Sequence, residues 1–292
     1  MAEYFVCRDI NLKTFNSMRV DAMCKSLVVP TSIEGMIDAL NDFYGKKVVL
    51  IGKGSNLIFT KEKYSEDYVF IATTFLCNIE MRGKKIAAQC GATMQSLSWF
   101  ALEQSSTGFE FMEDIPGSVG GGIIMNAGTY KDTIGQVADS LLWYSPSKKE
   151  RGSMKIQAEN LEKRNIRLPE ADAVILEVLF NTYPGNYNEI LEKILLVKKD
   201  RYTKQPRNYP SAGSVFKRPV IDGELLPVWQ LIEQAGLRGL SVGDAQVSEK
   251  HTGFIVNKGA ATGEELCETA EYCKRKVKEK FGIELELEWK LI

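Results

Sequence analysis

The chain has 292 residues, 44% of them hydrophobic, which is enough apolar material for two or three domains. Its 37 basic and 38 acidic residues nearly cancel, and this balance excludes the strong positive field that drives non-specific nucleic-acid binding. No apolar run approaches the roughly 20 residues that span a bilayer, and the first residues lack the basic and apolar regions of a signal peptide, so we expect a cytoplasmic protein.

Six cysteines lie at positions 7, 24, 77, 90, 267 and 273, and no two of them form a Cys-x-x-Cys pair. This spacing favours buried or incidental thiols over a zinc site or a dithiol redox pair. We therefore predict no metal site.

The first region predicts a small strand–helix–strand unit. Thr31-Ser-Ile-Glu34 has the pattern of a capping box, so we expect a helix from there to about Phe43. Residues 47–51 form a buried apolar run typical of a strand, and the turn at 52–56 leads back into extended structure at 57–59.

A second region begins near Tyr68, and its elements indicate an α+β arrangement rather than regular strand–helix–strand repeats. The apolar residues between 93 and 104 have helical spacing. Turn residues separate short strands, which we expect at 68–71, 78–81, 85–88, 138–144, 152–157 and 173–181.

A third region follows an amphipathic connecting helix, predicted over 188–201. After a loop at 204–213 we expect helices near 226–236 and 262–280, with Gly282 ending the last one and a terminal strand at 283–291. The predicted domains are 1–67 and 68–202 (two lobes for a cofactor), 203–282 (a substrate domain) and 283–292 (a strand returning to the active site).

Two glycine-rich segments are candidates for holding a phosphate. Gly52-Lys-Gly-Ser-Asn56 follows a strand, where glycines let the backbone approach an anion and where successive N–H groups can surround it. It matches neither the Walker A nor the Rossmann pattern, and a simple tight turn explains it equally well.

The second segment, residues 115–128, holds five glycines within twelve residues and is preceded by Phe109 and Phe111. Glycine costs roughly 0.5–1 kcal/mol relative to alanine in regular structure, so this density indicates backbone lying against something flat or anionic. Close packing of backbone on backbone is the structural alternative.

A local basic cluster surrounds Ser214, which follows a glycine turn. Lys204, Arg207, Lys217 and Arg218 make up this cluster and suit a pyrophosphate, although a solvated basic loop is the plainer interpretation.

Three further residues could take part in chemistry, namely His251, Glu286 and Glu288. The only histidine, His251, is interpreted as a hydrogen-bonded structural residue. Alternation in the terminal strand places Glu286 and Glu288 on one face, where a solvated strand face is the plainer alternative.

Taken together, these segments resemble the UDP-N-acetylenolpyruvoylglucosamine reductase (MurB) family. Each match is moderately specific, but the matches occur in the family's order across nearly the whole chain, and the ordered set is highly specific. They are Gly54-Ser-Asn56, Gly108-Phe-Glu-Phe111, Ile115-Pro-Gly-Ser-Val-Gly-Gly121, Met125-Asn-Ala-Gly128, Tyr209-Pro-Ser-Ala-Gly-Ser-Val-Phe-Lys217, Ala245-Gln-Val-Ser-Glu-Lys-His251, Phe254-Ile-Val-Asn257 and Lys280-Phe-Gly-Ile-x-Leu-Glu-x-Glu288.

The resemblance implies an α+β chain with a two-lobed FAD-binding fold of the vanillyl-alcohol-oxidase (PCMH) type plus a C-terminal α+β substrate domain. FAD would be held non-covalently, and NADPH would reduce it and leave before the substrate enters. The implied activity is that of a UDP-N-acetylmuramate dehydrogenase, which reduces UDP-N-acetylglucosamine enolpyruvate to UDP-N-acetylmuramate in peptidoglycan precursor synthesis, and so serves cell-wall biogenesis, cell shape and cell division.

The resemblance also implies site residues. The FAD-binding set is Gly52, Lys53, Gly54, Ser55, Asn56, Ile115, Pro116, Gly117, Ser118, Gly120, Gly121, Asn126, Ala127 and Gly128. The substrate-binding set is Lys204, Tyr209, Lys217, Arg218 and Gln246. We expect a monomer that binds small molecules, and neither nucleic acid nor membrane. The short span from Tyr183-Pro-Gly to Tyr209-Pro resembles the type II subgroup, which lacks an additional substrate-covering loop.

Three catalytic residues carry over from the family. Ser214 matches the proton donor to C2 of the substrate, and Glu288 matches the carboxyl group that assists at the enolpyruvate end. Arg164 matches the arginine that would bind the substrate carboxylate and stabilise developing charge. Its neighbours Lys163 and Ile166 depart from the family's Tyr-Arg-x-Ser motif, and Arg167 is the other candidate for this role.

Two more departures lie in or next to the cofactor segments, where Lys53 and Asp114 replace residues that are often glycine or small in the family. Two alternative functions remain open. One is another FAD-dependent oxidoreductase of the same fold, many of which attach the flavin covalently. The other is a non-catalytic paralogue that binds flavin or UDP-sugar, suggested by the unusual segment 163–166.

Overall fold

The computed structural model describes residues 3–129, 132–162, 165–221 and 223–292. Its contacts divide the chain into two units. Unit 1 comprises residues 1–8, 26–53 and 67–201, and unit 2 comprises residues 9–25, 54–66 and 202–292. The chain crosses between the units five times, once at Lys53–Gly54 inside the first glycine-rich segment. The division into four segments drawn from the sequence stays a prediction.

One sheet of unit 1 has parallel strands at its centre. Strand β6 (Tyr68–Ala72) pairs in parallel with β2 (Met23–Pro30) on one side and with β3 (Lys47–Ile51) on the other, and β1 (Tyr4–Asn11) continues the sheet beyond β2. Strands β1 and β2 each extend from one unit into the other.

Helix α1 (Ile33–Asp42) connects β2 to β3 and buries Met36, Ala39 and Leu40. The capping-box prediction was one residue early, because Ser32 rather than Thr31 is the N-cap and accepts the N–H of Gly35 at 2.9 Å.

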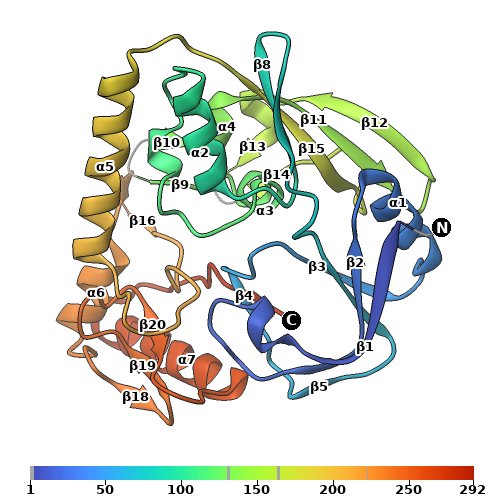
Figure 1. Ribbon diagram of the computed structural model, residues 1–292. Coiled ribbons are helices and arrows are strands. Elements are labelled where there is room, and N and C mark those ends of the chain that lie inside the picture. Colours follow the sequence, from blue (N-terminus) through green and yellow to red (C-terminus); the bar gives the residue numbers. More distant parts are fainter. Residues whose placement is uncertain (1–2, 130–131, 163–164, 222) are drawn as a thin grey trace. The chain divides into compact units, whose positions relative to one another are not determined.

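The other main sheet of unit 1 is antiparallel, in the order β12-β11-β15-β8-β7 (Figure 1). Its strands are β7 (Ile79–Arg82), β8 (Lys85–Gln89), β11 (Ala138–Ser145), β12 (Glu150–Lys155) and β15 (Val174–Asn181). Helices α2 (Met94–Glu103) and α3 (Val119–Ile124) contribute to the same apolar core, which also includes Met36 of α1. Both sheets of unit 1 therefore share one continuous core.

Short elements complete unit 1. They are the 3-10 turns η2 (Glu110–Met112) and η3 (Ala158–Asn160), the strand pairs β9 (Gly128–Thr129) with β10 (Asp132–Thr133) and β13 (Leu161–Glu162) with β14 (Asn165–Ile166), and helix α4 (Ile134–Val137).

Helix α5 (Tyr187–Lys204) packs on α2 through Ile190 and Ile194, which contact Leu102. The amphipathic prediction for this helix was partly wrong, because Leu195 is 51% exposed. Much of the contact between α5 and the rest of unit 1 is polar, as described below.

Unit 2 is built around an antiparallel sheet of β18 (Ser241–Val242), β19 (Ala245–Val247) and β20 (Ile255–Asn257), against which α7 (Gly263–Phe281) packs. Helix α7 begins with a capping box between Thr262 and Glu265. It ends at Gly282, as predicted, where the backbone has a left-handed φ of 70°. The remaining elements are η1 (Leu12–Phe15), β4 (Leu57–Ile58), β5 (Lys63–Tyr64), β16 (Val220–Ile221), β17 (Glu224–Leu225), α6 (Val228–Gln234) and β21 (Lys290–Leu291).

The predicted terminal strand is only partly formed. Within 283–291, the ladder is limited to β21, which pairs in parallel with β4, and Leu287 forms an isolated antiparallel bridge with Phe216. The segment whose residues alternate is therefore extended, as predicted. Its two parts pair with different partners, Leu287 with Phe216 and β21 with β4.

None of the helices in the described ranges is both long enough and apolar enough to cross a membrane.

Candidate functional site

The two glycine-rich segments meet inside unit 1. Gly52 follows β3, and a Cβ added to it would lie 2.1 Å from Ser118 Oγ in the second segment. No real Cβ tolerates that distance, so Gly52 is required for the approach itself. The structure thereby brings together two segments that are 66 positions apart in the sequence.

Backbone hydrogen bonds fix the second segment to the start of α2. The N–H of Met94 donates to Gly117 O at 3.1 Å, and the N–H of Val119 donates to Ala92 O at 2.7 Å. Ser118, which forms the bridge with Thr93 between these bonds, also caps α3 by accepting the N–H of Gly121 at 3.3 Å.

Most of the glycines in this segment are explained by packing. A Cβ on Gly120 would lie 2.9 Å from Cys90 Cβ, one on Gly122 would lie 2.9 Å from Met94 Sδ, and one on Gly128 would lie 2.0 Å from Asp132 O. Close backbone packing, the structural alternative, therefore accounts for these three positions.

Other atoms of the segment are placed to receive a ligand. Gly121 is exposed, and a Cβ there would meet only Ser118 Oγ, at 3.3 Å. The N–H groups of Gly117 and Ser118 donate to no acceptor among the described residues, whereas the next three N–H groups are already engaged. Thr129 Oγ1 is buried without a hydrogen-bond partner in the described part of the chain. These donors fit an anionic group such as a pyrophosphate.

The rest of the first glycine-rich segment, residues 54–56, belongs to unit 2. Gly54 has a φ of +59°, and a Cβ on it would lie 2.1 Å from Phe15 O. Asn56 donates through Nδ2 to Glu288 O at 2.9 Å, and its own carbonyl accepts the N–H of Lys290 at 2.9 Å. Asn56, which is predicted to bind the cofactor, is thus hydrogen-bonded to the backbone of Glu288, which is predicted to be catalytic.

Ser214 and Glu288 are neighbours in unit 2. The N–H of Glu288 donates to Val215 O at 2.8 Å, and the N–H of Lys217 donates to Glu286 O at 2.9 Å, on either side of the Phe216–Leu287 bridge. Ser214 is exposed and Glu288 is partly exposed. This register places Glu288 opposite Val215, the residue that follows Ser214, so the backbone brings together two segments that are 74 positions apart in the sequence.

The turn before Ser214 is fixed as well. Gly213 has a φ of +73°, which favours glycine, and Trp289 donates through Nε1 to Ala212 O at 3.1 Å. Ser17 donates through Oγ to Ser211 O at 2.7 Å. The Ser214 hydroxyl is therefore presented from a turn that is held at several points.

A basic pocket of about 410 Å³ in unit 2 includes two of the predicted substrate residues, Tyr209 and Gln246. Lys258 Nζ lies 4.0 Å from the centroid of the Tyr209 ring. The charged side chains that line the pocket are three cations and one carboxylate, namely Arg207, Lys250, Lys258 and Glu249. Burial lowers the pKa of Arg207, which a bound anion would offset. The arrangement suits a phosphate or diphosphate.

The other predicted substrate residues do not line this pocket. Lys217 forms an ion pair with Glu286 at 2.9 Å, and this hydrogen bond lowers the pKa of Glu286. Lys204 is the last residue of α5, and Arg218 is exposed. Lys250 and Lys258 were missed from the sequence, although Lys250 lies within the matched motif at 245–251.

His251 has the structural role that was expected. Its Nδ1 accepts the N–H of Gly253 at 3.1 Å, and its ring packs edge-on against Phe254 with centroids 5.0 Å apart. Burial lowers the pKa of His251 and favours the neutral ring.

The catalytic arginine assignment stays a prediction. Arg164, together with Lys163, lies outside the described residues. Arg167 follows β14 in unit 1 and is exposed, and its N–H donates to Asn160 O at 2.9 Å.

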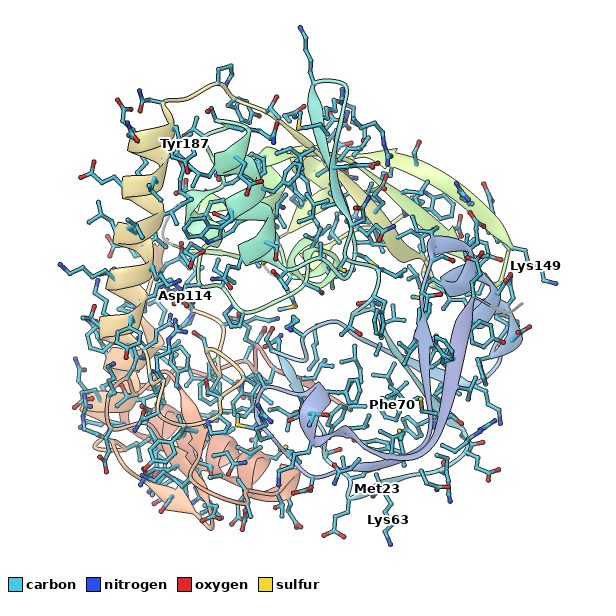
Figure 2. All side chains as sticks on the ribbon, in the orientation of Figure 1. Met23, Lys63, Phe70, Asp114, Lys149 and Tyr187 are labelled. Atoms are coloured by element: carbon cyan, nitrogen blue, oxygen red, sulfur yellow. The ribbon has the colours of Figure 1, made fainter. Side chains whose placement is uncertain are left out.

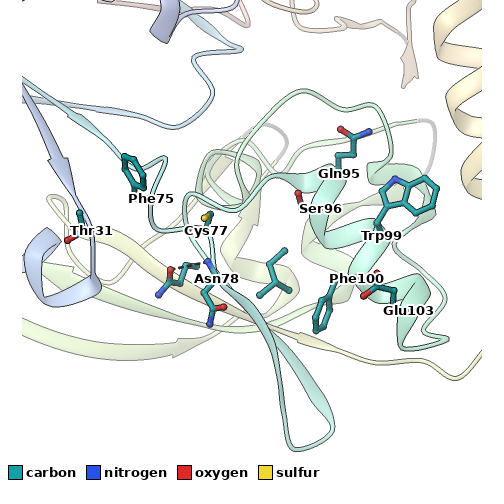
Figure 3. A pocket seen from close by; sticks show the side chains of 11 residues that line it. Thr31, Phe75, Cys77, Asn78, Gln95, Ser96, Trp99, Phe100 and Glu103 are labelled. Atoms are coloured by element: carbon teal, nitrogen blue, oxygen red, sulfur yellow. Dashed lines mark hydrogen bonds between the residues drawn. The ribbon is translucent and has the colours of Figure 1, made fainter.

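Unit 1 also has a pocket beside α2, with a volume of about 810 Å³ (Figure 3). Phe75, Trp99 and Phe100 line it together with neutral polar side chains such as Asn78 and Gln95. None of the predicted site residues belongs to it.

Comparison with known proteins identifies the family. Residues 205–292 match the family model described as UDP-N-acetylenolpyruvoylglucosamine reductase, C-terminal domain. A protein of that name from Geobacillus kaustophilus is 39% identical over 289 residues, covering 98% of this chain and 93% of the relative. The chain belongs to the UDP-N-acetylenolpyruvoylglucosamine reductase family.

Other reductases of this family agree along the whole chain. The relative from Fervidobacterium nodosum is 38% identical over 268 residues, covering 90% of this chain and 84% of the relative. The crystal structure of the Thermus caldophilus reductase superposes with a TM-score of 0.82 at 26% identity, covering 98% of this chain and 99% of that one.

Residues 24–146 match the model described as FAD binding domain, and this match supports FAD binding by the reductase-family chain. The predicted fold class, an α+β two-lobed FAD-binding fold of the vanillyl-alcohol-oxidase type with a C-terminal α+β substrate domain, is confirmed.

Proposed function

We propose that the chain reduces UDP-N-acetylglucosamine enolpyruvate to UDP-N-acetylmuramate in peptidoglycan precursor synthesis, with FAD as cofactor and NADPH as hydride donor. Family membership supports the reaction class. The observation that carries the proposal is the hydrogen bond from Glu288 N–H to Val215 O, the residue after Ser214, because the proposed proton donor and the assisting carboxylate then come from one hydrogen-bonded part of unit 2.

Ser214 is the proposed proton donor to C2 of the enolpyruvyl group. Saturating the double bond needs a hydride at C3 and a proton at C2, and negative charge develops at C2 and in the carboxylate before the proton arrives. A serine hydroxyl is a weak acid, but a carbanion of this kind is a strong base, so the transfer is favourable. Glu288 assists at the same end of the substrate.

The remaining residues bind and orient. Arg164 or Arg167 would hold the substrate carboxylate through its planar fork. The basic pocket at Tyr209 and Gln246 would take the diphosphate of the UDP-sugar.

For the cofactor, the N–H groups of Gly117 and Ser118, with Gly52 packed against Ser118, would hold the FAD pyrophosphate. When bound, FAD supplies the hydride transfer between NADPH and the substrate. We further propose non-covalent FAD, a monomeric state and a cytoplasmic location.

The test is an assay of purified protein for bound flavin and for NADPH oxidation. We expect yellow protein that oxidises NADPH only when the enolpyruvyl UDP-sugar is present. Acid precipitation should release the flavin into the supernatant. NADPH oxidation that does not depend on the sugar, or flavin that stays with the pellet, would favour another flavin enzyme of the same fold instead.

A further inference from the structure

A cluster of ion pairs lies immediately before the cofactor segment, on the side that faces α5. Three carboxylates between positions 110 and 114 each approach a cation of that helix. The pairs are Glu110 with Lys193 at 3.9 Å, Glu113 with Lys198 at 3.0 Å, and Asp114 with Arg201 at 3.6 Å. All six residues belong to unit 1.

Glu113 is the most buried carboxylate of the cluster, with 0% exposure. It accepts hydrogen bonds from Gln95 Nε2 at 3.0 Å, from Trp99 Nε1 at 2.7 Å and from Lys198 Nζ at 3.0 Å. A buried carboxylate is tolerated only with such partners, so α2 and α5 together determine the position of residue 113.

Asp114 has a left-handed backbone, with a φ of +67°. Residues other than glycine adopt this conformation rarely and keep it only where the surroundings enforce it. Arg201 provides such a constraint, because its Nε donates to Asp114 O at 3.3 Å and lies 3.6 Å from Asp114 Oδ2, with both side chains largely buried. Figure 2 shows Asp114 beside α5.

Lys198 and Arg201 are three positions apart, so both project from the same face of α5. The backbone that leaves Asp114 continues through Ile115 and Pro116 to Gly117 and Ser118, whose N–H groups have no acceptor among the described residues. The φ of Asp114 therefore fixes how the chain enters the segment that carries these donors, and the hydrogen bonds to the start of α2 hold its other end.

We propose that Lys198 and Arg201 are positioning residues for the cofactor. By holding Glu113 and the left-handed Asp114 against α5, they orient the N–H groups of Gly117 and Ser118 toward the FAD pyrophosphate. This inference rests on the proposed binding of FAD at residues 115–118.

The experiment measures the FAD dissociation constant of refilled protein by flavin fluorescence, and the unfolding temperature of each variant without cofactor. Lys198→Met and Arg201→Met are compared with Lys193→Met, which removes the same charge from the same helix at the longest of the three contacts. We expect the first two variants to bind FAD about tenfold or more weakly, and Lys193→Met to stay within about twofold of the unmodified protein. Arg201→Lys should recover part of the affinity.

A double-mutant cycle separates orientation from general stability. Asp114→Gly removes the carboxylate but allows the same φ without strain, so Arg201→Met should cost less than about threefold in that background. The proposal is overturned if Lys198→Met and Arg201→Met bind FAD like Lys193→Met. It is also overturned if, across the variants, the rise in the FAD dissociation constant simply follows the fall in unfolding temperature without cofactor. Unmodified protein that takes up no FAD overturns both this inference and the proposed function.

Discussion

Gly52 and Ser118 approach so closely that a Cβ at residue 52 would lie 2.1 Å from the serine hydroxyl. This contact joins the two glycine-rich segments of unit 1. It assigns different roles to glycines that look alike in the sequence. Gly52 and Gly120 permit packing, whereas Gly121 is exposed and leaves space beside the uncommitted N–H groups of Gly117 and Ser118.

Gly52→Ala should separate the two segments, because the new methyl group overlaps Ser118 Oγ. Overpacking of this kind costs about 1–3 kcal/mol in the free energy of unfolding, and we expect FAD affinity to fall with it. Thermal unfolding and flavin titration measure both effects. The double variant Gly52→Ala/Ser118→Gly should recover most of the loss, since glycine is nearly as good an N-cap as serine. A single variant that behaves like the unmodified protein would show that the contact is not rigid.

Glu288→Gln and Glu286→Gln form a matched pair on the terminal segment. Glu288 lies beside Ser214, so its loss should reduce turnover about a hundredfold or more while the protein stays folded. Glu286 is exposed and pairs with Lys217, so its loss should leave turnover within about twofold. Steady-state rates at saturating substrate distinguish the two, and equal effects would remove the assigned role of Glu288.

Local signals predicted much of the fold. The apolar run at 47–51 became β3 with the expected bounds, and Gly282 ends α7 as expected. The expectation that this strand is buried was wrong, because only Ile51 of β3 is buried. The terminal segment was less predictable, because alternation shows extended structure without naming a partner. Its pairing is divided between Phe216 and β4, both distant in the sequence.

Motifs in the sequence nominate some site residues, whereas contacts that form only in the folded chain cannot be predicted from the sequence. Ser214 and Glu288 came from motifs, and the structure adds that Glu288 is hydrogen-bonded to Val215, the residue after Ser214. The contact of Lys198 with Glu113 joins positions 85 apart on separate elements, and no spacing rule reveals it. Lys258 was missed for the same reason, since only the fold places it over Tyr209.

His251 should make stability depend on pH. Burial lowers its pKa below the ordinary 6.5, so below that pH the unfolded chain binds more protons than the folded one. The stability that comes from the neutral His251 ring is fully present above about pH 6.5, and it is lost as the pH falls toward the pKa of the folded state. We expect the unfolding temperature of the unmodified protein to fall more steeply between about pH 7.5 and pH 5 than that of His251→Gln. Parallel curves would contradict the neutral, buried ring.

Lys258→Ala tests the basic pocket as the diphosphate site. Loss of one charged contact should raise the KM for the UDP-sugar about tenfold, with kcat within about twofold. Lys276→Ala is the control, because it removes a cation that pairs with Glu279 on the exposed face of α7. A lower kcat at unchanged KM would place Lys258 in the chemical step instead.

The central claim is that Ser214 protonates the substrate, and the half-reactions of Ser214→Ala test it most directly. Stopped-flow absorbance follows reduction of the flavin by NADPH, and then its reoxidation by the enolpyruvyl UDP-sugar. We predict that the variant is reduced at close to the rate of the unmodified protein, and that reoxidation by the sugar slows by about a hundredfold or more. Reoxidation at the unmodified rate would contradict the proposed role of Ser214.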